Sequence, residues 1–337
     1  MPRPTAPRIL AVRLSSIGDV ILITPLLRAI RARHPEAHLA VLTKRAMAPL
    51  LQDDPRVDEV IALEPGESLR SIARRLRRGR FTHCLDLHGS LRSRMLRLLI
   101  PGRWHGYDKR AAARWALIHL HRDWYRDQVP TPERYFEAAR DLDVHPDGGP
   151  PEVFAPATAV SAADGWLADR RVPPRFVALA PGAAHATKRW PVESWEALAA
   201  SLAERGLGVV TVGGPDDQAV GARVAAAAGT AGANAAGATA LIETAALLQR
   251  AVATVAGDTG VMHLATAVGT PVVALFGPTV RQFGFAPYTA AATVVERDLD
   301  CRPCSAHGSA RCPLGHHDCL RRMEVATVEA ALLEWIR

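Results

Sequence analysis

The segment Gly257–His263 carries a carboxylate, a hydroxyl, a glycine and an imidazole, a combination that suits binding of a phosphorylated ligand. It follows the apolar run Ala251–Ala256, which predicts a buried strand, and we expect a helix over residues 259–268. The free N–H groups and positive dipole end of that helix would face an anion. Two alternatives stay open, in which Asp258 only caps the helix and His263 is an ordinary core residue.

A second carboxylate on a glycine turn lies near the start of the chain. The run Ile9–Val12 predicts a buried strand, and we expect a helix from Val20 to Ala32 after the turn. A carboxylate in such a turn can take a proton from an attacking hydroxyl, so Asp19 is our candidate general base. Gly18 favours this role because it lets backbone and ligand approach closely. Helix capping by Asp19 is compatible with it.

The same alternation of strand, turn and helix recurs along the chain and predicts an α/β fold with doubly wound, largely parallel sheets. A stretch rich in proline and glycine, Val144–Pro156, marks a domain linker. We therefore expect Rossmann-like domains over residues 1–155 and 156–337, with the carboxyl ends of both sets of strands facing one cleft. The expected strands are Ile9–Val12, Leu39–Leu42, Glu59–Ala62, His83–Leu87, Phe176–Ala180, Gly208–Val212, Ala251–Ala256 and Pro271–Phe276.

The net charge of +7 indicates an anionic partner, since much of the positive excess lies in the first half, between Arg70 and Arg114. A solvated arginine-rich surface is the alternative. Few aromatic residues accompany these arginines and no nucleic-acid-binding motif is present, so we expect no nucleic-acid partner. No apolar stretch reaches the roughly 18 residues that a membrane span needs. The N-terminus is unlike a signal peptide, and we therefore expect a cytoplasmic location.

Four segments follow one another along the chain: Ser15–Asp19 with Thr24 and Pro25, Asp86–Ser93, Pro181–Pro191, and Asp258–Thr279. Together they resemble glycosyltransferase family 9, the bacterial lipopolysaccharide heptosyltransferases, from Ile9 to the C-terminus. The resemblance implies a GT-B fold in which the first domain binds the acceptor and the second binds a nucleotide sugar. It also implies inverting, metal-independent transfer of a heptose from ADP-heptose to an anionic, lipid-linked inner-core saccharide. The enzyme would be peripheral to the inner face of the inner membrane and would need no cofactor.

The resemblance also assigns the nucleotide-sugar site. Lys188 matches the family's lysine and would neutralise the leaving diphosphate, a catalytic task parallel to that of Asp19. Thr187 would add a hydroxyl, and Asp216 would lie near the ribose or base, although a loop carboxylate without a contact is the alternative. The full expected set is Thr187, Lys188, Asp216, Asp258, Thr259, Gly260 and His263.

The expected acceptor site belongs to the first domain. Its residues are Ser16, Gly18, Asp86, His88 and Arg92. The planar guanidinium of Arg92 suits a phosphate or a sugar-acid carboxylate of the acceptor. A structural salt bridge is an equal alternative for that residue.

Four cysteines gather near the end of the chain: Cys301, Cys304, Cys312 and Cys319. In a cytosolic chain such a cluster suggests a structural zinc or an iron–sulfur site, with nearby histidines as substitute ligands. The resemblance weakens this interpretation, because many family members share a cysteine-rich tail and the reaction needs no metal. We therefore expect no metal, with a structural zinc as the alternative. The fifth cysteine, Cys84, lies in an expected strand and suits core packing.

Other functions remain possible from the sequence. Residues that bind the diphosphate do not determine which nucleobase the donor carries. A UDP- or GDP-sugar donor for another surface glycan is therefore the first alternative. A non-catalytic protein built on the cysteine cluster and the basic surface is the second. A nicotinamide-dependent dehydrogenase is disfavoured, because the first turn lacks the G-x-G-x-x-G fingerprint. The cysteine tail weakly favours the second heptose transfer, but no residue identifies the acceptor, and a monomer is the default.

Overall fold

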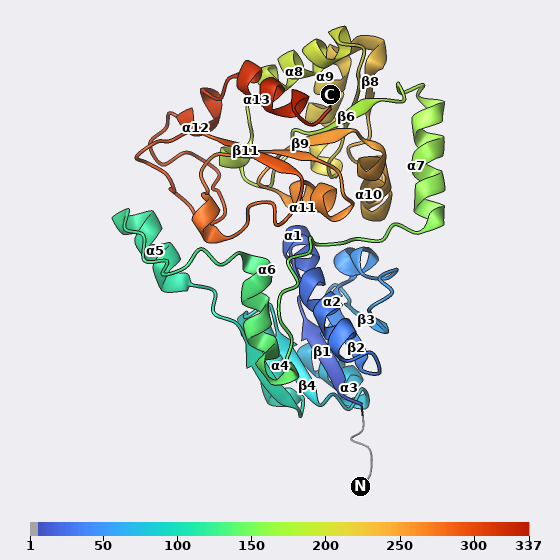
Figure 1. The fold of residues 1–337 in the computed structure, drawn as a ribbon, viewed down its shortest axis with the longest axis vertical. Helices are drawn as coiled ribbons and strands as arrows, with labels where there is room; N and C mark the ends of the chain where they lie inside the picture. Colours follow the sequence, from blue (N-terminus) through green and yellow to red (C-terminus); the bar gives the residue numbers. More distant parts are fainter. Residues whose placement is uncertain (1–5, 337) are drawn as a thin grey trace. The chain divides into compact units, whose positions relative to one another are not determined.

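The computed structural model describes residues 6–336 and divides the chain into two compact units. The first comprises the chain up to Lys109 together with Val129–Phe154. The second comprises Arg110–Gln128 together with the chain from Ala155 onward. The segment Arg110–Gln128, which we expected in the first domain, thus groups with the second unit. Each unit has helices packed on its own sheet (Figure 1).

The first unit is built on a sheet that has five strands within residues 6–336, and all neighbouring strands are parallel. The strands are β1 Arg8–Val12, β2 His38–Lys44, β3 Glu59–Leu63, β4 His83–Asp86 and β5 Arg103–Gly106. Their order across the sheet is β3-β2-β1-β4-β5, so the direction of winding reverses between β1 and β4. Ligands of open α/β sheets bind where the loops leave the carboxyl ends of two such strands.

The helices of the first unit cover the sheet in two groups, because α2 contacts α6 and η2, whereas α3 contacts α4. The elements are α1 Ile17–Ile21, α2 Thr24–Arg33, η1 Arg45–Leu50, α3 Leu69–Arg78, α4 Leu91–Leu99, α6 Thr131–Arg134 and η2 Tyr135–Leu142, where η denotes a 3-10 helix. Leu10, Val12 and Leu42 from the central strands pack with Ile72 and Leu76 of α3 in one buried cluster.

One helix expected from the sequence is interrupted. We predicted a single helix over residues 20–32, but the structure contains α1 and α2 with a break between them. Pro25 has no backbone N–H and therefore cannot donate to the carbonyl of Ile21. The hydroxyl of Thr24 donates to that carbonyl instead, at 2.8 Å. The Thr24-Pro25 pair thus sets the start of α2 and leaves α1 as a short helix that presents Asp19.

The second unit has a parallel sheet with six strands in the described part of the chain. The strands are β6 Phe176–Ala180, β7 Gly208–Thr211, β8 Gly232–Asn234, β9 Ala253–Gly257, β10 Val272–Phe276 and β11 Ala292–Glu296. The order is β11-β10-β9-β6-β7-β8, so the winding reverses between β9 and β6. The predicted α/β class with parallel sheets is confirmed.

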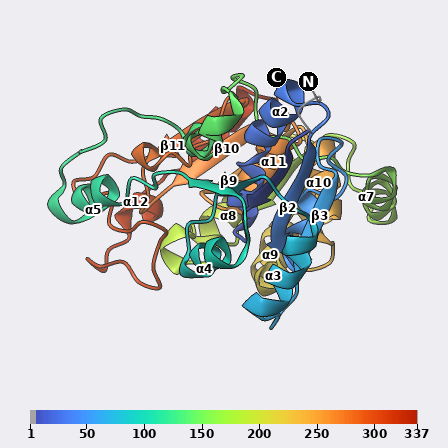
Figure 2. The same ribbon diagram turned by 90° about the horizontal axis from the view of Figure 1, so that it is seen from below.

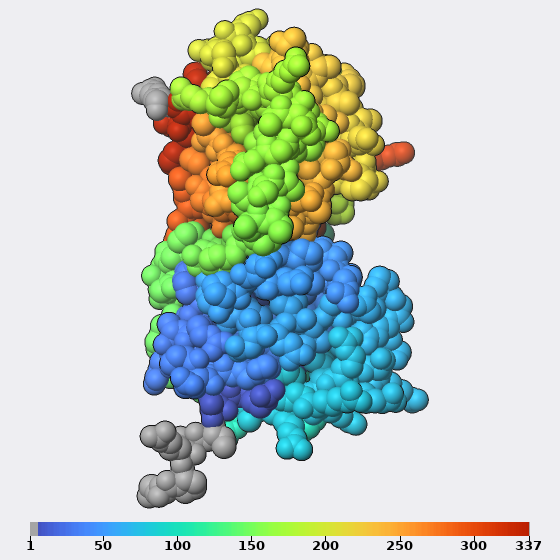
Figure 3. All heavy atoms as spheres, turned by 90° about the vertical axis from the view of Figure 1, so that its right-hand side faces the viewer, coloured from blue at the N-terminus to red at the C-terminus, as the bar shows by residue number. Residues whose placement is uncertain are grey.

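Helices cover both faces of this second sheet. Helix α8 contacts α9 and α13, while α10 contacts α7 and α11; α7 lies on the surface (Figure 3). The elements are α5 Ala111–Leu120, α7 Ala157–Asp169, η3 Ala186–Lys188, α8 Val192–Glu204, η4 Pro215–Asp217, α9 Gln218–Ala227, η5 Gly229–Ala231, α10 Leu241–Arg250, α11 Gly260–Ala267, η6 Arg281–Phe283, α12 Asp318–Arg321 and α13 Val325–Leu333. Within residues 6–336, no helix is both long enough and apolar enough to cross a membrane.

Candidate functional site

The carboxylate of Asp19 is held in the first turn of α1, directly after β1. Its Oδ1 lies 2.6 Å from a guanidinium nitrogen of Arg13, and 19% of its side chain is exposed. Its Oδ2 accepts hydrogen bonds from the backbone N–H and the hydroxyl of Ser16, at 3.1 and 2.8 Å. Ser16 is the N-cap residue of α1 and Asp19 binds back to it, so Asp19 supports the cap without occupying the cap position.

These contacts decide the protonation state of Asp19. Burial disfavours the charged carboxylate, but the attraction of Arg13 and the hydrogen bonds from Ser16 outweigh it, and together they lower the pKa of Asp19. The carboxylate is therefore ionised at neutral pH and has the charge that a general base needs. The same ion pair makes it a weaker base than a free carboxylate.

Three residues that the sequence analysis did not single out surround this carboxylate. Arg13 is buried and donates to the carbonyl of Leu87 and, at 3.4 Å, to the hydroxyl of Tyr107. The guanidinium lies 5.7 Å from the ring centre of Tyr135, whose hydroxyl is 3.5 Å from Oδ1 of Asp19. An arginine directly after the apolar run Ile9–Val12 is a detectable signal for Arg13. The tyrosines come from distant segments and give none.

The loop after β4 lies beside the Asp19 loop, because β1 and β4 are neighbours. The carboxylate of Asp86 stabilises this loop. It accepts hydrogen bonds from the N–H groups of His88 and Gly89 and from the hydroxyl of Ser93. Burial, together with the positive charges of Arg13 and Lys109, lowers the pKa of His88 to about 4. His88 is therefore neutral at pH 7, and its predicted contact with an acceptor would add no charge.

The remaining predicted acceptor residues differ in exposure. Gly18 is buried in α1, whereas Ser16 and Arg92 are exposed. Arg92 donates one long hydrogen bond, 3.5 Å, to the carbonyl of Glu67. No carboxylate among residues 6–336 pairs with it, so the salt-bridge alternative is not supported. Contact of these residues with an acceptor stays a prediction.

In the second unit, Lys188 and Asp258 form an ion pair at the carboxyl ends of the adjacent strands β6 and β9. Nζ of Lys188 lies 2.7 Å from Oδ2 of Asp258 and 2.9 Å from its carbonyl oxygen. The hydroxyl of Thr279 donates to the same carboxylate oxygen at 2.7 Å. The two side chains are 15% and 9% exposed, so the pair is largely shielded from water.

The N-terminus of α11 follows this pair directly. Thr259 occupies the N-cap position and Gly260 is the first helical residue, so the expected start is confirmed to within one residue. The hydroxyl oxygen of Thr259 is buried and has no hydrogen-bond partner within residues 6–336. His263 is 4% exposed and lies one turn onward. An unsatisfied hydroxyl beside the free amides of a helix fits a phosphate that accepts from both.

Thr187 has a task other than the predicted phosphate contact. Its hydroxyl is hydrogen-bonded to the backbone N–H and carbonyl of Ser309, at 2.8 and 3.0 Å. Its carbonyl lies 2.9 Å from Nε2 of His317. Gly308, at φ +93°, packs so tightly here that a Cβ would lie 2.8 Å from Cβ of His185 and 3.2 Å from Cγ of Lys188. The cysteine-containing tail thus fixes the loop that carries Lys188.

The loop after β7 presents a different carboxylate from the one expected. Asp216 is exposed, whereas Asp217 accepts from the N–H of Gly214 at 2.9 Å. A Cβ on Gly182 would lie 2.0 Å from Oδ1 of Asp217, and a Cβ on Gly213 would lie 2.7 Å from its Oδ2. The carboxylate packed at the ends of β6 and β7 is therefore that of Asp217, and nucleoside contact by Asp216 stays a prediction.

The cysteines of the tail are all free thiols. Within residues 6–336, no three His, Cys, Asp or Glu side chains converge so that they could hold a metal ion. Burial, followed by the neighbouring cysteines, raises the pKa of Cys319 to about 11 and also raises that of Cys304. The expected absence of a metal in the tail stays a prediction, and a structural zinc stays its alternative.

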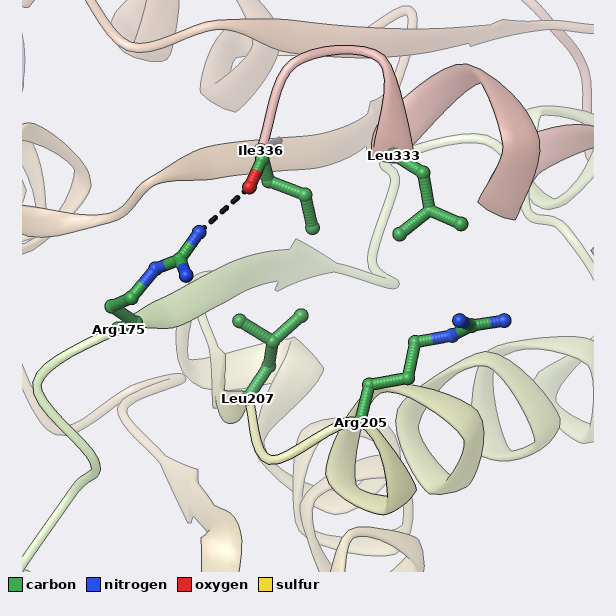
Figure 4. Close-up of a pocket in the computed structure, with 5 residues that line it drawn as sticks. All are labelled: Arg175, Arg205, Leu207, Leu333 and Ile336. Carbon is green, nitrogen blue, oxygen red and sulfur yellow. Dashed lines mark hydrogen bonds between the residues drawn. The ribbon is translucent and has the colours of Figure 1, made fainter.

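Two described pockets lie away from these residues. One is lined by Arg175, Arg205, Leu207, Leu333 and Ile336, with Arg175 donating to the carbonyl of Ile336 at 2.6 Å (Figure 4). Arg175 and Leu207 directly precede β6 and β7. A second pocket includes Pro7 and Thr82, which directly precede β1 and β4. Both pockets are thus at the amino ends of the strands, opposite the edges that carry Asp19 and Lys188.

Comparisons with known proteins agree with the site. The family model of glycosyltransferase family 9 (heptosyltransferase) matches residues 69–314, which include Lys188 and Asp258 but begin after Asp19. Lipopolysaccharide heptosyltransferase 2 of Salmonella typhimurium is 31% identical over 300 residues, covering 82% of this chain and 84% of the relative. The protein of the same name from Escherichia coli K12 is 30% identical over 298 residues, with the same coverage.

A solved structure extends the similarity to nearly the whole chain. The structure of Escherichia coli ADP-heptose lipopolysaccharide heptosyltransferase II has a TM-score of 0.76 and 27% identity, and the match covers 98% of both chains. The predicted GT-B fold, the family and the transferase class are confirmed. The chain therefore belongs to glycosyltransferase family 9 and is a glycosyltransferase related to the lipopolysaccharide heptosyltransferases.

Proposed function

We propose that this enzyme transfers a heptose from ADP-heptose to an anionic, lipid-linked inner-core saccharide, with inversion and without a catalytic metal. The observation that carries the proposal is the Lys188–Asp258 pair at the N-terminus of α11. It provides a fixed ammonium and free helix amides at the switch point of the second sheet. The name of the Escherichia coli structure, which specifies ADP-heptose, supports the choice of donor.

Lys188 can donate one further hydrogen bond, to a phosphate. An ammonium group carries three N–H bonds, and within residues 6–336 Lys188 uses two of them for two oxygen atoms of Asp258. The third N–H is available to a phosphate oxygen. Because Asp258 offsets the charge of Lys188, the amides of α11 and the hydroxyl of Thr259 must share in holding the diphosphate. These groups would stabilise the charge that develops as the nucleoside diphosphate leaves.

Asp19 would act on the acceptor. Its ionised carboxylate takes the proton of the attacking hydroxyl while the oxygen forms a bond to the anomeric carbon of the heptose. The bond between that carbon and the diphosphate oxygen breaks, and ADP leaves with its electron pair. Attack from the face opposite the leaving group inverts the anomeric centre. Arg13 and Tyr135 would orient Asp19 throughout this step.

The acceptor and location follow from charge. The arginine-rich first unit suits the phosphates of a lipid-linked saccharide, which is the substrate class that the names of the relatives indicate. We therefore place the enzyme in the cytoplasm, peripheral to the inner face of the inner membrane. A monomer is the default state.

Isothermal titration of the purified protein with ADP, UDP and GDP, with and without EDTA, tests the donor. The proposal predicts that ADP binds best, that EDTA has no effect, and that Lys188→Ala weakens binding. Lys44→Ala is the matched control, since this exposed lysine belongs to the other unit. A preference for UDP or GDP would replace the donor, and loss of binding in EDTA would contradict metal independence.

A further inference from the structure

Helix α4 of the first unit exposes three large apolar side chains along one side. Leu91, Met95 and Leu98 are 77%, 42% and 85% exposed. Their spacing of four and three residues places them on one stripe of the helix. Isolated exposed apolar residues are ordinary, but a continuous stripe indicates a surface that is covered by a partner.

The opposite side of α4 attaches the helix to the core. Ser93, Leu96 and the following Ile100 are all buried. Two arginines flank the apolar stripe, because Arg92 and Arg94 are exposed and lie about 100° and 60° from Leu91 around the helix axis. The helix is thus amphipathic in an unusual sense: one side packs into the protein, and the other presents leucine and methionine between guanidinium groups.

Helix α3 widens this basic surface. It packs beside α4 (Figure 2). Nε of Arg77 donates to the carbonyl of Leu99 at 2.7 Å. Among the exposed arginines of α3 and α4, four have no ion pair or side-chain hydrogen bond with any described residue: Arg70, Arg74 and Arg78 of α3 and Arg94 of α4. Unpaired guanidinium groups beside an apolar stripe match the phosphates and acyl chains of an anionic bilayer.

We propose that α4, together with the arginines of α3, is the surface by which this enzyme binds an anionic phospholipid bilayer. Leu91, Met95 and Leu98 would enter the boundary between head groups and acyl chains, while the arginines contact lipid phosphates. A second copy of the chain is a poorer occupant, because a symmetric contact between two such surfaces brings their arginines together. A nucleic acid would leave the apolar stripe unused.

This surface is continuous with the predicted acceptor loop. Ser90 is the N-cap residue of α4, and His88 and Gly89 immediately precede it. A bilayer-bound α4 therefore holds that loop at the membrane surface, where the saccharide of a lipid-linked acceptor lies. This consequence rests on the proposed function, whereas bilayer binding itself does not.

Co-sedimentation of the full chain with vesicles tests the proposal without any nucleotide or acceptor. The vesicles contain phosphatidylcholine alone or with phosphatidylglycerol. Leu98→Ser is compared with Leu314→Ser, since Leu314 is also exposed, at 64%, but belongs to the second unit. Arg74→Gln with Arg94→Gln is compared with Arg311→Gln with Arg321→Gln, which removes the same charge from exposed sites of the second unit.

We expect the wild type to prefer vesicles that contain phosphatidylglycerol. Leu98→Ser should weaken binding about tenfold, and the double arginine variant about 25-fold, while each control changes it by less than about twofold. Equal binding to both vesicle types, or equal losses in variants and controls, would overturn the proposal. The proposal would also be overturned if analytical ultracentrifugation without vesicles showed a dimer for the wild type and a monomer for Leu98→Ser. Nucleotide titration of the same samples shows separately whether the donor site is intact.

Discussion

Nζ of Lys188 lies 2.7 Å from the carboxylate of Asp258 and 2.9 Å from the carbonyl oxygen of the same residue, although 70 positions separate them in the chain. They meet because β6 and β9 are hydrogen-bonded neighbours and each residue follows the carboxyl end of its strand. An almost fully shielded ion pair of this kind is costly to break from one side, since the remaining charge has no partner. Removing one partner therefore destabilises the protein, whereas removing both charges should not. Variants of one and of both residues can thus separate the effect of the pair on stability from its effect on ligand binding.

Lys188→Ala should lower both nucleotide affinity and stability. Loss of a charge-assisted hydrogen bond to phosphate should weaken ADP binding by roughly 10- to 100-fold. The unpaired Asp258 should cost about 3 kcal/mol of the free energy of unfolding. Titration with ADP and urea unfolding measure the two effects.

The double variant Lys188→Ala with Asp258→Asn distinguishes them. It removes the orphaned charge, so most of the stability should return while ADP affinity remains low. Recovery of affinity together with stability would show that Lys188 acts only through folding.

Thr259→Val should weaken ADP binding about fivefold without loss of stability. Its hydroxyl has no partner within residues 6–336, so removing it breaks no hydrogen bond of the free protein. Thr254→Val is the matched control, because its hydroxyl is likewise buried without a partner in the described chain but lies inside β9. We expect unchanged ADP affinity in the control, measured by titration. Equal losses in both variants would argue against phosphate contact by Thr259.

Gly308→Ala should disturb the Lys188 loop more than Gly315→Ala. Both glycines have positive φ, +93° and +76°, so both substitutions carry a similar backbone cost of about 1 kcal/mol. Only at position 308 would the new Cβ meet a neighbour, at 2.8 Å from Cβ of His185, whereas Gly315 has no atom within 4 Å. ADP affinity and Tm should fall further for Gly308→Ala. Identical values for the pair would mean that the tail does not position Lys188.

Arg13→Gln should move the acid limb of kcat/KM to higher pH. In the wild type, Arg13 and Ser16 hold the pKa of Asp19 below its ordinary value of 3.8, although burial opposes them. Without the arginine, burial dominates and the pKa of Asp19 rises, with Tyr135, Tyr107 and His88 still facing it. A pH profile of kcat/KM measures this shift. Arg13→Lys keeps a positive charge beside Asp19 and should return the profile most of the way to that of the wild type.

The sign of the stability effect follows from the same shift. A carboxyl group whose pKa is lowered on folding adds stability above its ordinary pKa and loses it as the pH falls through the lowered value. Wild-type stability should therefore drop below pH 3.8, and Arg13→Gln should show a smaller drop there. Parallel curves for the two proteins would contradict the role of the Arg13–Asp19 pair.

Sequence patterns located the central strands well, because buried parallel strands are continuous apolar runs. The strands β5, β8 and β11 were missed; they lie at sheet edges, and sequences such as Gly232–Asn234 have no such run. The turns that carry Asp19 and Asp258 could be recognised from local residue types, whereas Lys188 was assigned only through the family resemblance. The order of the strands across the sheet could not be predicted from the sequence. It is this order that brings Lys188 to Asp258.

Side-chain direction was equally inaccessible to sequence. The analysis named Asp216, but the carboxylate at the strand ends is that of Asp217, one residue on in the same 3-10 helix. It assigned Thr187 to a phosphate, whereas the tail, 122 residues away, uses that hydroxyl. Tyr107 and Tyr135 approach Asp19 from separate segments, so no local pattern could indicate them.

Transfer of heptose from ADP-heptose to a heptose-deficient lipopolysaccharide acceptor, by wild type and by Asp19→Asn, tests the central claim most directly. Asparagine keeps the shape of the side chain but cannot take a proton. We predict that kcat falls by about 10²- to 10⁴-fold while the Kd for ADP is unchanged, since Asp19 and Lys188 lie in different units. Wild-type turnover by Asp19→Asn would contradict the assignment of Asp19 as the base.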